Sequence, residues 1–166
     1  MRYAKPLTGA LLALALAGPV TAASIGVNDQ APQIVAEQID GQPFDLSQHR
    51  GKRPVYLKFW ATWCSYCVEE MPHLQASMRK YGDRLAVQTV NVGFNDSQAN
   101  IRQLYQKNQL DIPVIFDSKG EITARYGVIG TPTHLLIDRN GVVRYSSHLL
   151  TDQLEETLAA LVAEEG

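Results

Sequence analysis

Two cysteines separated by two residues stand where a strand pattern gives way to a helical one. The apolar run from Val55 to Ala61 is rich in β-branched and aromatic residues and leads directly to Cys64. From Cys64 to Lys80, apolar residues recur at spacings of three and four, which predicts a helix. The chain must therefore fold so that Cys64 lies at the start of a helix and Cys67 about one turn further along.

Cys64 and Cys67 are the only cysteines of the 166-residue chain. A disulfide across so short a spacer constrains the unfolded chain little, so a purely structural bond is a poor explanation. A structural zinc site would need two more ligands, and the four histidines are scattered singly. At a helix N-terminus, unpaired N–H groups and the helix dipole stabilise a thiolate. The pair therefore predicts a redox dithiol in which Cys64 attacks and Cys67 resolves.

The rest of the chain alternates strand and helix patterns. Strands are expected at 34–39, 85–92, 112–116, 133–138 and 142–147. Helices are expected after 97, with Asp96 or Ser97 as the N-cap, at 121–126 and from 154 onward. Pro72 should kink the helix that follows the cysteines. Turn signals at Asp40-Gly41 and Asn140-Gly141 predict two hairpins. This order predicts an α/β sandwich whose sheet is parallel in its centre and ends in an antiparallel hairpin.

The first 22 residues have the pattern of an export signal. Two basic residues precede a short apolar run from Leu7 to Ala17, and a Gly-Pro break and small residues follow. This order is typical of a cleavable secretory signal peptide. The alternative is an uncleaved membrane anchor, but a membrane span needs roughly 20 apolar residues and this run is shorter. We expect residues 1–22 to be a signal peptide, residues 23–166 to form one domain, and the location to be periplasmic. A formal charge of −2 gives no indication of a nucleic-acid partner.

A second motif lies far from the cysteines, at Gly130-Thr131-Pro132-Thr133, where Pro132 must sit at the edge or start of a strand. Together with Phe59 to Cys67, Glu70-Met71-Pro72 and Leu136-Ile137-Asp138, it resembles the thioredoxin superfamily. More narrowly, the chain is similar to TlpA/ResA-type exported disulfide reductases from about Ala31 to Val162. The resemblance implies a thioredoxin-like three-layer sandwich with an N-terminal β extension and a central strand–helix insertion around Val92 to Leu110.

The resemblance also implies roles for individual residues. Pro132 matches the cis-proline that packs against the cysteines, and Thr131 before it would offer backbone groups to an extended substrate. Trp63 matches the aromatic residue that flanks the active site, whereas Trp60 is expected in the core. Glu70 matches a carboxylate that assists proton transfer. Its position three residues after Cys67 allows it to share a helix face with that thiol.

Lys58 departs from thioredoxin, which keeps a buried aspartate six residues before its first cysteine. An unpaired ammonium on a strand covered on both faces would cost several kcal/mol. Lys58 must therefore reach outward or pair with a carboxylate; we expect a pair with Glu70 in which the lysine also favours the thiolate. His134 could lie near the dithiol or on the surface, and the other three histidines are expected on the surface.

The function expected from these features is a periplasmic disulfide reductase with no cofactor and no metal. Its substrates would be oxidised secreted proteins or apocytochrome c during cytochrome c maturation. A membrane thiol transporter of DsbD type would keep it reduced, and the protein would be a monomer. Three alternatives remain: a disulfide-forming oxidase or isomerase, a thiol peroxidase, and a copper(I) metallochaperone. The first uses the same fold and is hard to separate from a reductase by sequence.

Overall fold

The computed structural model describes residues 24–164, so the expected signal peptide at 1–22 lies outside it. The described part of the chain folds around a five-stranded sheet with a small two-stranded hairpin beside it. The strands are β1 (Val35–Glu37), β2 (Pro43–Asp45), β3 (Val55–Trp60), β4 (Ala86–Asn91), β5 (Val114–Phe116), β6 (Thr133–Ile137) and β7 (Val143–Ser147). The α-helices are α1 (Ser65–Glu69), α2 (Met71–Tyr81), α3 (Gln98–Asn108), α4 (Glu121–Arg125) and α5 (Asp152–Ala163).

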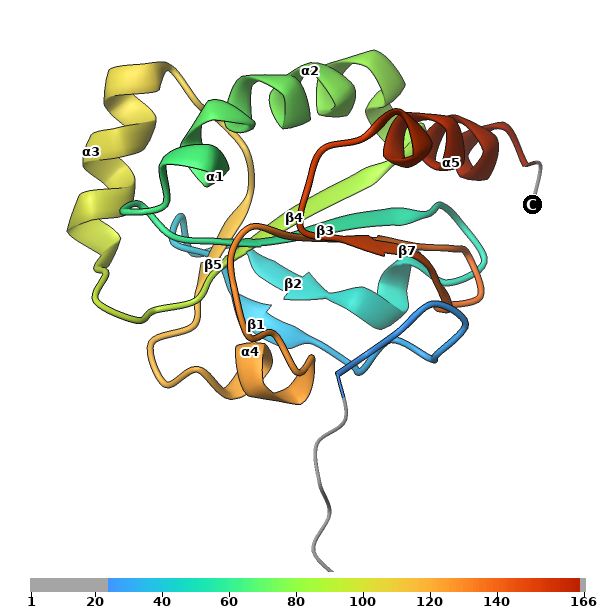
Figure 1. The fold of residues 1–166 in the computed structure, drawn as a ribbon, viewed down its shortest axis with the longest axis horizontal. Helices are drawn as coiled ribbons and strands as arrows, with labels where there is room; N and C mark the ends of the chain where they lie inside the picture. The colour runs from blue at the N-terminus through green and yellow to red at the C-terminus, as the bar shows by residue number, and fades with distance from the viewer. Residues whose placement is uncertain (1–23, 165–166) are drawn as a thin grey trace, which may run out of the picture.

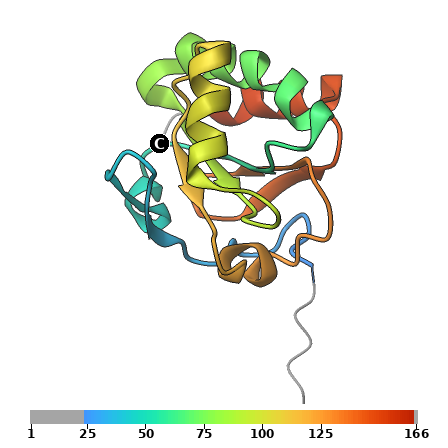
Figure 2. The ribbon, with the colours of Figure 1, turned by 90° about the vertical axis from the view of Figure 1, so that its left-hand side faces the viewer.

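The molecule has three layers, with the sheet in the middle. Figure 1 shows α1, α2 and α5 above the sheet, and α4 with the β1–β2 hairpin below it. Figure 2 shows α3 on the same side as α1 and α2. This is the thioredoxin-like α/β sandwich with an N-terminal β extension that the sequence predicted. No helix in residues 24–164 combines the length and apolarity needed to cross a membrane.

The strand order is β5-β4-β3-β6-β7, with β3 in the centre. β3 runs parallel to β4, and β4 runs parallel to β5, whereas β6 is antiparallel to both β3 and β7. The expectation of a sheet parallel in its centre is therefore right on one side of β3 only. The connection from β5 to β6 contains the five-residue helix α4 and does not return along the sheet. β6 consequently starts at the end of the sheet where β5 stops.

The insertion differs from the prediction in one detail. Residues 92–110 contain helix α3 but no strand, and the strand of the insertion, β5, follows at Val114–Phe116. β5 is the edge of the main sheet, and the hairpin covers it: the backbone N–H of Ile39 donates to the carbonyl of Val114 at 2.9 Å. The N-terminal extension thus protects an edge that would otherwise be open to pairing with another chain.

The helix after the cysteines is broken at Glu70, as Pro72 predicted. Glu70 ends α1 and also precedes α2, and Pro72 stands in the first turn of α2, where its missing N–H costs nothing. A proline at that position cannot donate to the preceding turn, so α1 and α2 form two helices instead of one. The break places Glu70 at a corner between the two helices, above the central strand.

The central strand β3 is buried along its whole length, which explains its continuous apolar sequence. Trp60 is fully buried and stacks on Tyr105, as expected for a core residue. Lys58 is the exception among the six residues of β3, because it brings a charge into this layer with only 1 % of its surface exposed. A buried ammonium requires a partner, which the site supplies.

Candidate active site

Cys64 and Cys67 form a disulfide at the N-terminus of α1. Cys64 is the N-cap residue, and its Sγ accepts a hydrogen bond from the backbone N–H of Cys67 at 3.3 Å. The two cysteines differ in exposure, since Cys64 keeps 9 % of its surface exposed and Cys67 keeps none. The N–H at the cap would also stabilise a thiolate on Cys64. The geometry therefore gives a substrate access to Cys64 and shields Cys67.

The loop between α4 and β6 approaches the disulfide from the other half of the sheet. The Thr131–Pro132 peptide bond is cis, as the resemblance implied, and Pro132 is buried at the start of β6. Thr131 is half-buried, and within residues 24–164 its backbone N–H and C=O make no backbone hydrogen bond. An extended chain segment could use both groups, as in the addition of a strand to a sheet edge.

An apolar pocket lies between this loop and the loop that carries the cysteines. Its volume is about 330 Å³. Its lining includes Trp63, Val92, Phe94, Val128, Ile129 and Thr131. Three of these side chains are strongly exposed, and Ile129 keeps 94 % of its surface in solvent. Exposed apolar side chains gathered at one place indicate a binding surface.

Trp63 forms one wall of the pocket. Its indole Nε1 donates to the carbonyl oxygen of Phe94 at 2.8 Å, and the two aromatic rings meet edge to face. These contacts hold the indole upright beside Cys64 while 52 % of the residue remains exposed. Trp63 also lines a second, more polar groove of about 610 Å³ between α1 and α3. Trp63 therefore separates the apolar pocket from the polar groove and lines both.

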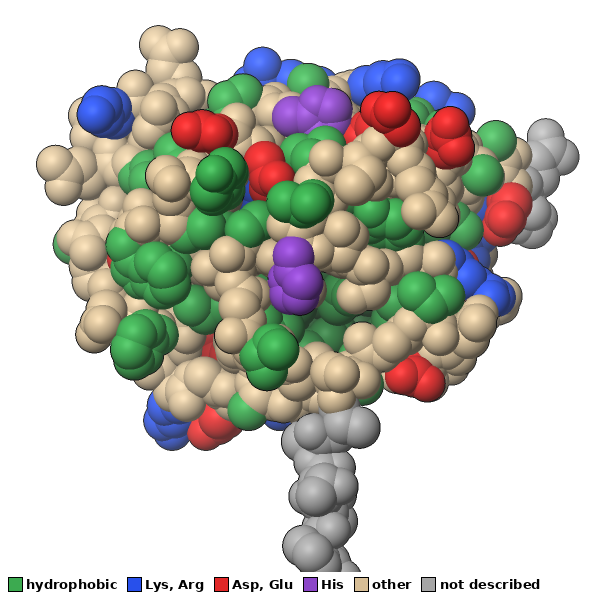
Figure 3. Space-filling view, in the orientation of Figure 1, with side chains coloured by type: hydrophobic (Ala, Val, Ile, Leu, Met, Phe, Trp, Pro, Cys, Tyr) green, Lys and Arg blue, Asp and Glu red, His purple; other side chains and the backbone are tan. Residues whose placement is uncertain are grey.

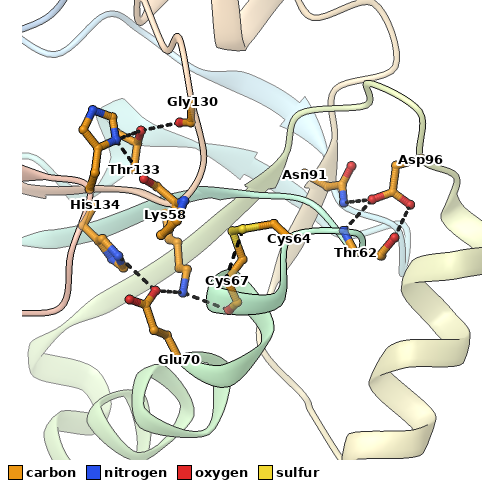
Figure 4. The surroundings of a disulfide bond; sticks show 12 residues. Lys58, Thr62, Cys64, Cys67, Glu70, Asn91, Asp96, Gly130, Thr133 and His134 are labelled. Atoms are coloured by element: carbon orange, nitrogen blue, oxygen red, sulfur yellow. Dashed lines mark hydrogen bonds and ion pairs between the residues drawn. A yellow bond between two sulfur atoms is a disulfide. The ribbon is translucent and has the colours of Figure 1, made fainter.

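Lys58 and Glu70 form the ion pair that the sequence predicted. Lys58 Nζ lies 2.8 Å from Glu70 Oε2 and also donates to the backbone oxygen of Cys67 at 3.2 Å. Figure 4 shows both contacts beneath the disulfide. Burial lowers the pKa of Lys58, and the neighbouring carboxylate opposes this. Burial alone would raise the pKa of Glu70, but contacts with His134 and Lys58 outweigh it and lower the pKa to about 2.

His134 belongs to the same cluster. It is fully buried, its Nε2 lies 3.1 Å from Glu70 Oε2, and its Nδ1 lies 2.9 Å from the hydroxyl of Tyr56. The surface alternative for this histidine is therefore wrong. His148 is exposed, as expected; it caps the start of β6 through the carbonyl of Pro132 at 2.9 Å. His73 is exposed and His49 is half-buried. Figure 3 shows histidine side chains, in purple, at the surface of this face.

Asp96 is a site residue that sequence reasoning missed. Its carboxylate accepts hydrogen bonds from the backbone N–H of Thr62 at 2.7 Å and from the Thr62 hydroxyl at 2.8 Å. It also accepts from the side chain of Asn91 and from the backbone of Ser97. The sequence identified Asp96 only as a possible helix cap, and the cap of α3 is Ser97. Asp96 instead ties the loop before Cys64 to the insertion, as Figure 4 shows.

The fold and the site together define a thioredoxin-like thiol–disulfide oxidoreductase. The chain belongs to the AhpC/TSA family, whose family model matches residues 27–146. Thiol-disulfide oxidoreductase ResA of Bacillus thuringiensis is 33% identical over 134 residues, which are 80% of this chain and 76% of that protein.

Solved structures agree with this assignment. A thiol:disulfide interchange protein from Chlorobium tepidum, described as DsbE, superposes with a TM-score of 0.72 at 30% identity, covering 84% of this chain and 100% of that chain. The pneumococcal exposed lipoprotein thioredoxin of Streptococcus pneumoniae gives 0.67 at 30% identity, covering 78% and 100%. The redox interpretation of the cysteine pair therefore rests on sequence, geometry and relatives together.

Proposed function

We propose that the protein reduces disulfides of other proteins by dithiol exchange. The thiolate of Cys64 attacks one substrate sulfur, the substrate S–S bond breaks, and a mixed disulfide forms while the released substrate thiolate takes a proton. The thiolate of Cys67 then attacks Cys64 Sγ and releases the second substrate thiolate, which is protonated in turn. Two electrons pass from the dithiol to the substrate, and the product is the Cys64–Cys67 disulfide. The unequal exposure of the two cysteines is the observation that carries this assignment.

The proposed substrate is an extended protein segment with an apolar side chain close to its cysteine. Within residues 24–164 the backbone of Thr131 makes no backbone hydrogen bond, and the cis Pro132 follows it at the start of β6. The pocket beside Trp63 has room for one large side chain. Backbone hydrogen bonds would give affinity without sequence preference, while the pocket would select what lies beside the cysteine.

Glu70 and Lys58 are proposed to handle the charge that the reaction creates on the buried sulfur. Cys67 must become a thiolate to resolve the mixed disulfide, and burial opposes that ionisation. Lys58 is held at the backbone of Cys67, where its positive charge favours the thiolate. Glu70 anchors the lysine. With a pKa of about 2 it is a weak base, so it holds the leaving proton only transiently and passes it on to water.

We further propose that the protein is exported to the periplasm and acts there as a monomer. The signal-like pattern of residues 1–22 supports export, as does the description of the pneumococcal relative as an exposed protein. Membrane thiol transporters of DsbD type are the proposed electron donors. Oxidised secreted proteins are the proposed substrates, and apocytochrome c is one candidate, in cytochrome c maturation.

The Cys67→Ser variant tests both the mechanism and the substrate class. This variant can attack a substrate but cannot resolve, so its partners remain bound to Cys64. We expect thiol-sensitive adducts with exported cysteine-containing proteins, and none with the matched Cys64→Ser variant. Equal trapping by the two variants would contradict the assignment of Cys64 as attacking thiol. A reduction potential near the oxidising end of the superfamily, about −120 mV, would instead indicate a disulfide-forming oxidase.

A further inference from the structure

The pairing of β3 with β6 places His134 directly opposite Lys58. Residues that face each other across two strands project from the same side of the sheet, with Cβ atoms roughly 5 Å apart. Both side chains are buried, and the corner between α1 and α2, which carries Glu70, lies over them. Lys58 from β3 and His134 from β6 thus both contact the carboxylate of Glu70, which lies over the sheet.

Both side chains approach the same oxygen of that carboxylate. Lys58 Nζ lies 2.8 Å and His134 Nε2 lies 3.1 Å from Glu70 Oε2. The histidine contact is close but poorly aligned, so Nε2 has no well-formed hydrogen bond within residues 24–164. A buried N–H without an acceptor is unfavourable, so the imidazole favours the arrangements of Glu70 that keep Oε2 within its reach.

Tyr56 determines which imidazole nitrogen carries the proton. Its hydroxyl lies 2.9 Å from His134 Nδ1, and burial raises the pKa of the phenol, so it keeps its proton. Glu70 as a carboxylate can only accept. The arrangement that satisfies both neighbours has the Tyr56 O–H donating to Nδ1, with the proton of the neutral imidazole on Nε2, facing Glu70. Burial also lowers the pKa of His134, which keeps the ring neutral.

We propose that His134 is a positioning residue for the dithiol: its Nε2–H restrains Oε2 of Glu70 beside Lys58, and the hydroxyl of Tyr56 restrains the imidazole in turn. This inference rests on the proposed role of Glu70 as a proton acceptor. The restraint gives the carboxylate one orientation, in which Oε2 is committed and Oε1 remains to exchange protons. Lys58 alone would leave Glu70 free to rotate about its flexible side chain.

Other titratable groups also face this cluster. Lys58 and Tyr56 come from β3, Glu70 and Cys67 from the helix corner, Tyr145 from β7, His148 from the segment after β7, and Glu155 from α5. Of these, Lys58 and Glu70 carry opposite charges in contact with each other, and Glu70 also contacts the histidine, so a change at His134 should affect Glu70 first.

A matched pair of variants in the full-length chain separates the two ring nitrogens. His134→Gln places an amide near the position of Nε2 and can still donate to Glu70, whereas His134→Asn reaches only the position of Nδ1. The readout is the carboxyl titration of Glu70, followed by carbon-13 NMR in the oxidised protein. We expect His134→Asn to raise the titration midpoint by about one unit and His134→Gln to raise it less. A midpoint unchanged by His134→Asn overturns the proposal.

Two further measurements do not depend on the stability of those variants. Nitrogen-15 shifts of the imidazole at neutral pH should show the proton on Nε2, and Tyr56→Phe should shift the ring toward a mixture of tautomers. A proton on Nδ1 in the unmodified protein overturns the proposal. If His134 acts through Glu70, adding His134→Asn to Glu70→Gln should leave the pH profile of insulin reduction as in Glu70→Gln alone; a further change overturns it.

The same variants distinguish the proposed role of Glu70 from its positioning by His134. If Glu70→Gln leaves the pH profile of insulin reduction unchanged while His134→Asn still moves the titration of Glu70, the proposed role of Glu70 fails. The positioning of Glu70 by His134 then stands on its own. If Glu70→Gln changes the profile but His134→Asn moves neither the profile nor the titration, the positioning inference fails and the role of Glu70 stands.

Discussion

The backbone nitrogen of Thr62 lies 2.7 Å from Oδ2 of Asp96, although the two residues are 34 positions apart. This contact anchors the loop before Cys64 to the segment between β4 and α3, which contains Asp96. The Thr62 hydroxyl is engaged by the same carboxylate at 2.8 Å. The loop is therefore tied to the insertion through both the backbone and the side chain of Thr62.

Asp96→Ala should loosen this loop and destabilise the protein by about 1–2 kcal/mol, because it leaves the N–H of Thr62 and the amide of Asn91 without their acceptor. The pKa of Asp96 is lowered because hydrogen bonds to its ionised form outweigh burial. Its contribution is therefore present above the usual aspartate range and lost as pH falls through the lowered value. Urea unfolding at pH 7 and at acid pH should show the variant converging on the parent protein; a constant difference would contradict this.

Lys58→Met should raise the pKa of the reduced dithiol, because it removes the positive charge held at the backbone of Cys67. The measurement is the ultraviolet absorbance of the thiolate as a function of pH. Arg79→Met is a suitable control, since it removes an exposed positive charge that pairs with Asp111 on the surface. An unchanged thiolate titration in Lys58→Met would refute the role of the lysine.

Removing Glu70 from the buried ion pair should lower the stability of the protein more than removing Lys58. Glu70→Gln leaves the ammonium of Lys58 buried without its counter-charge, which should cost about 3 kcal/mol. Lys58→Met leaves a carboxylate whose side chain is 15 % exposed and can turn toward water, so it should cost less. The double variant should recover much of the loss. Denaturant unfolding at pH 7 checks the order, and equal losses would contradict it.

That stability difference should itself depend on pH. The pKa of Glu70 is lowered to about 2, so its ionised form stabilises the fold above the ordinary glutamate range, and this stabilisation disappears as pH falls through 2. The gap between the parent protein and Glu70→Gln should therefore narrow in acid. Unfolding experiments between about pH 5 and pH 2 measure the gap. A gap that widens in acid would show that the carboxylate is not ionised in the folded protein.

Ile129→Glu should impair protein substrates more than small ones. The side chain lines the apolar pocket beside Thr131 and is almost fully exposed, so its replacement should leave the fold intact. We expect kcat/KM for insulin to fall about tenfold, a loss of roughly 1.4 kcal/mol, with little change for oxidised glutathione. Val35→Glu, at an exposed apolar position on β1 outside the pocket, is the control. Equal losses with both substrates would exclude the pocket from substrate selection.

The sequence predicted the elements because their patterns are local. The β run before Cys64, the kink at Pro72 and the hairpin at Asn140-Gly141 each depend on a few neighbouring residues. The pair of Lys58 with Glu70 could also be predicted, since a buried ammonium needs a carboxylate partner and Glu70 follows the same cysteine motif. The direction of β6 could not, because it depends on the path of the whole connection from β5 to β6 and not on a local pattern.

His134 and Asp96 could not be placed from sequence for a related reason. The burial of His134 follows from the register of β3 with β6, strands that are separated by more than 70 residues. The contact of Asp96 with Thr62 follows from how the loop after β4 folds back over the active site. Each has a plausible local alternative, a surface histidine or a helix cap, and only the tertiary fold decides between them.

The tie between Thr62 and Asp96 has a consequence for engineering. A designer who grafts the Trp-Cys-Ser-Tyr-Cys stretch onto another scaffold would transfer the reactive sulfurs but leave behind the carboxylate that anchors their loop. The smallest transplantable unit is discontinuous: the strand and helix corner from Lys58 to Glu70, the anchor at Asp96, and the strand start from Thr131 to His134. The five-residue motif thus identifies the chemistry, but a transplanted site would need all three segments in their native arrangement.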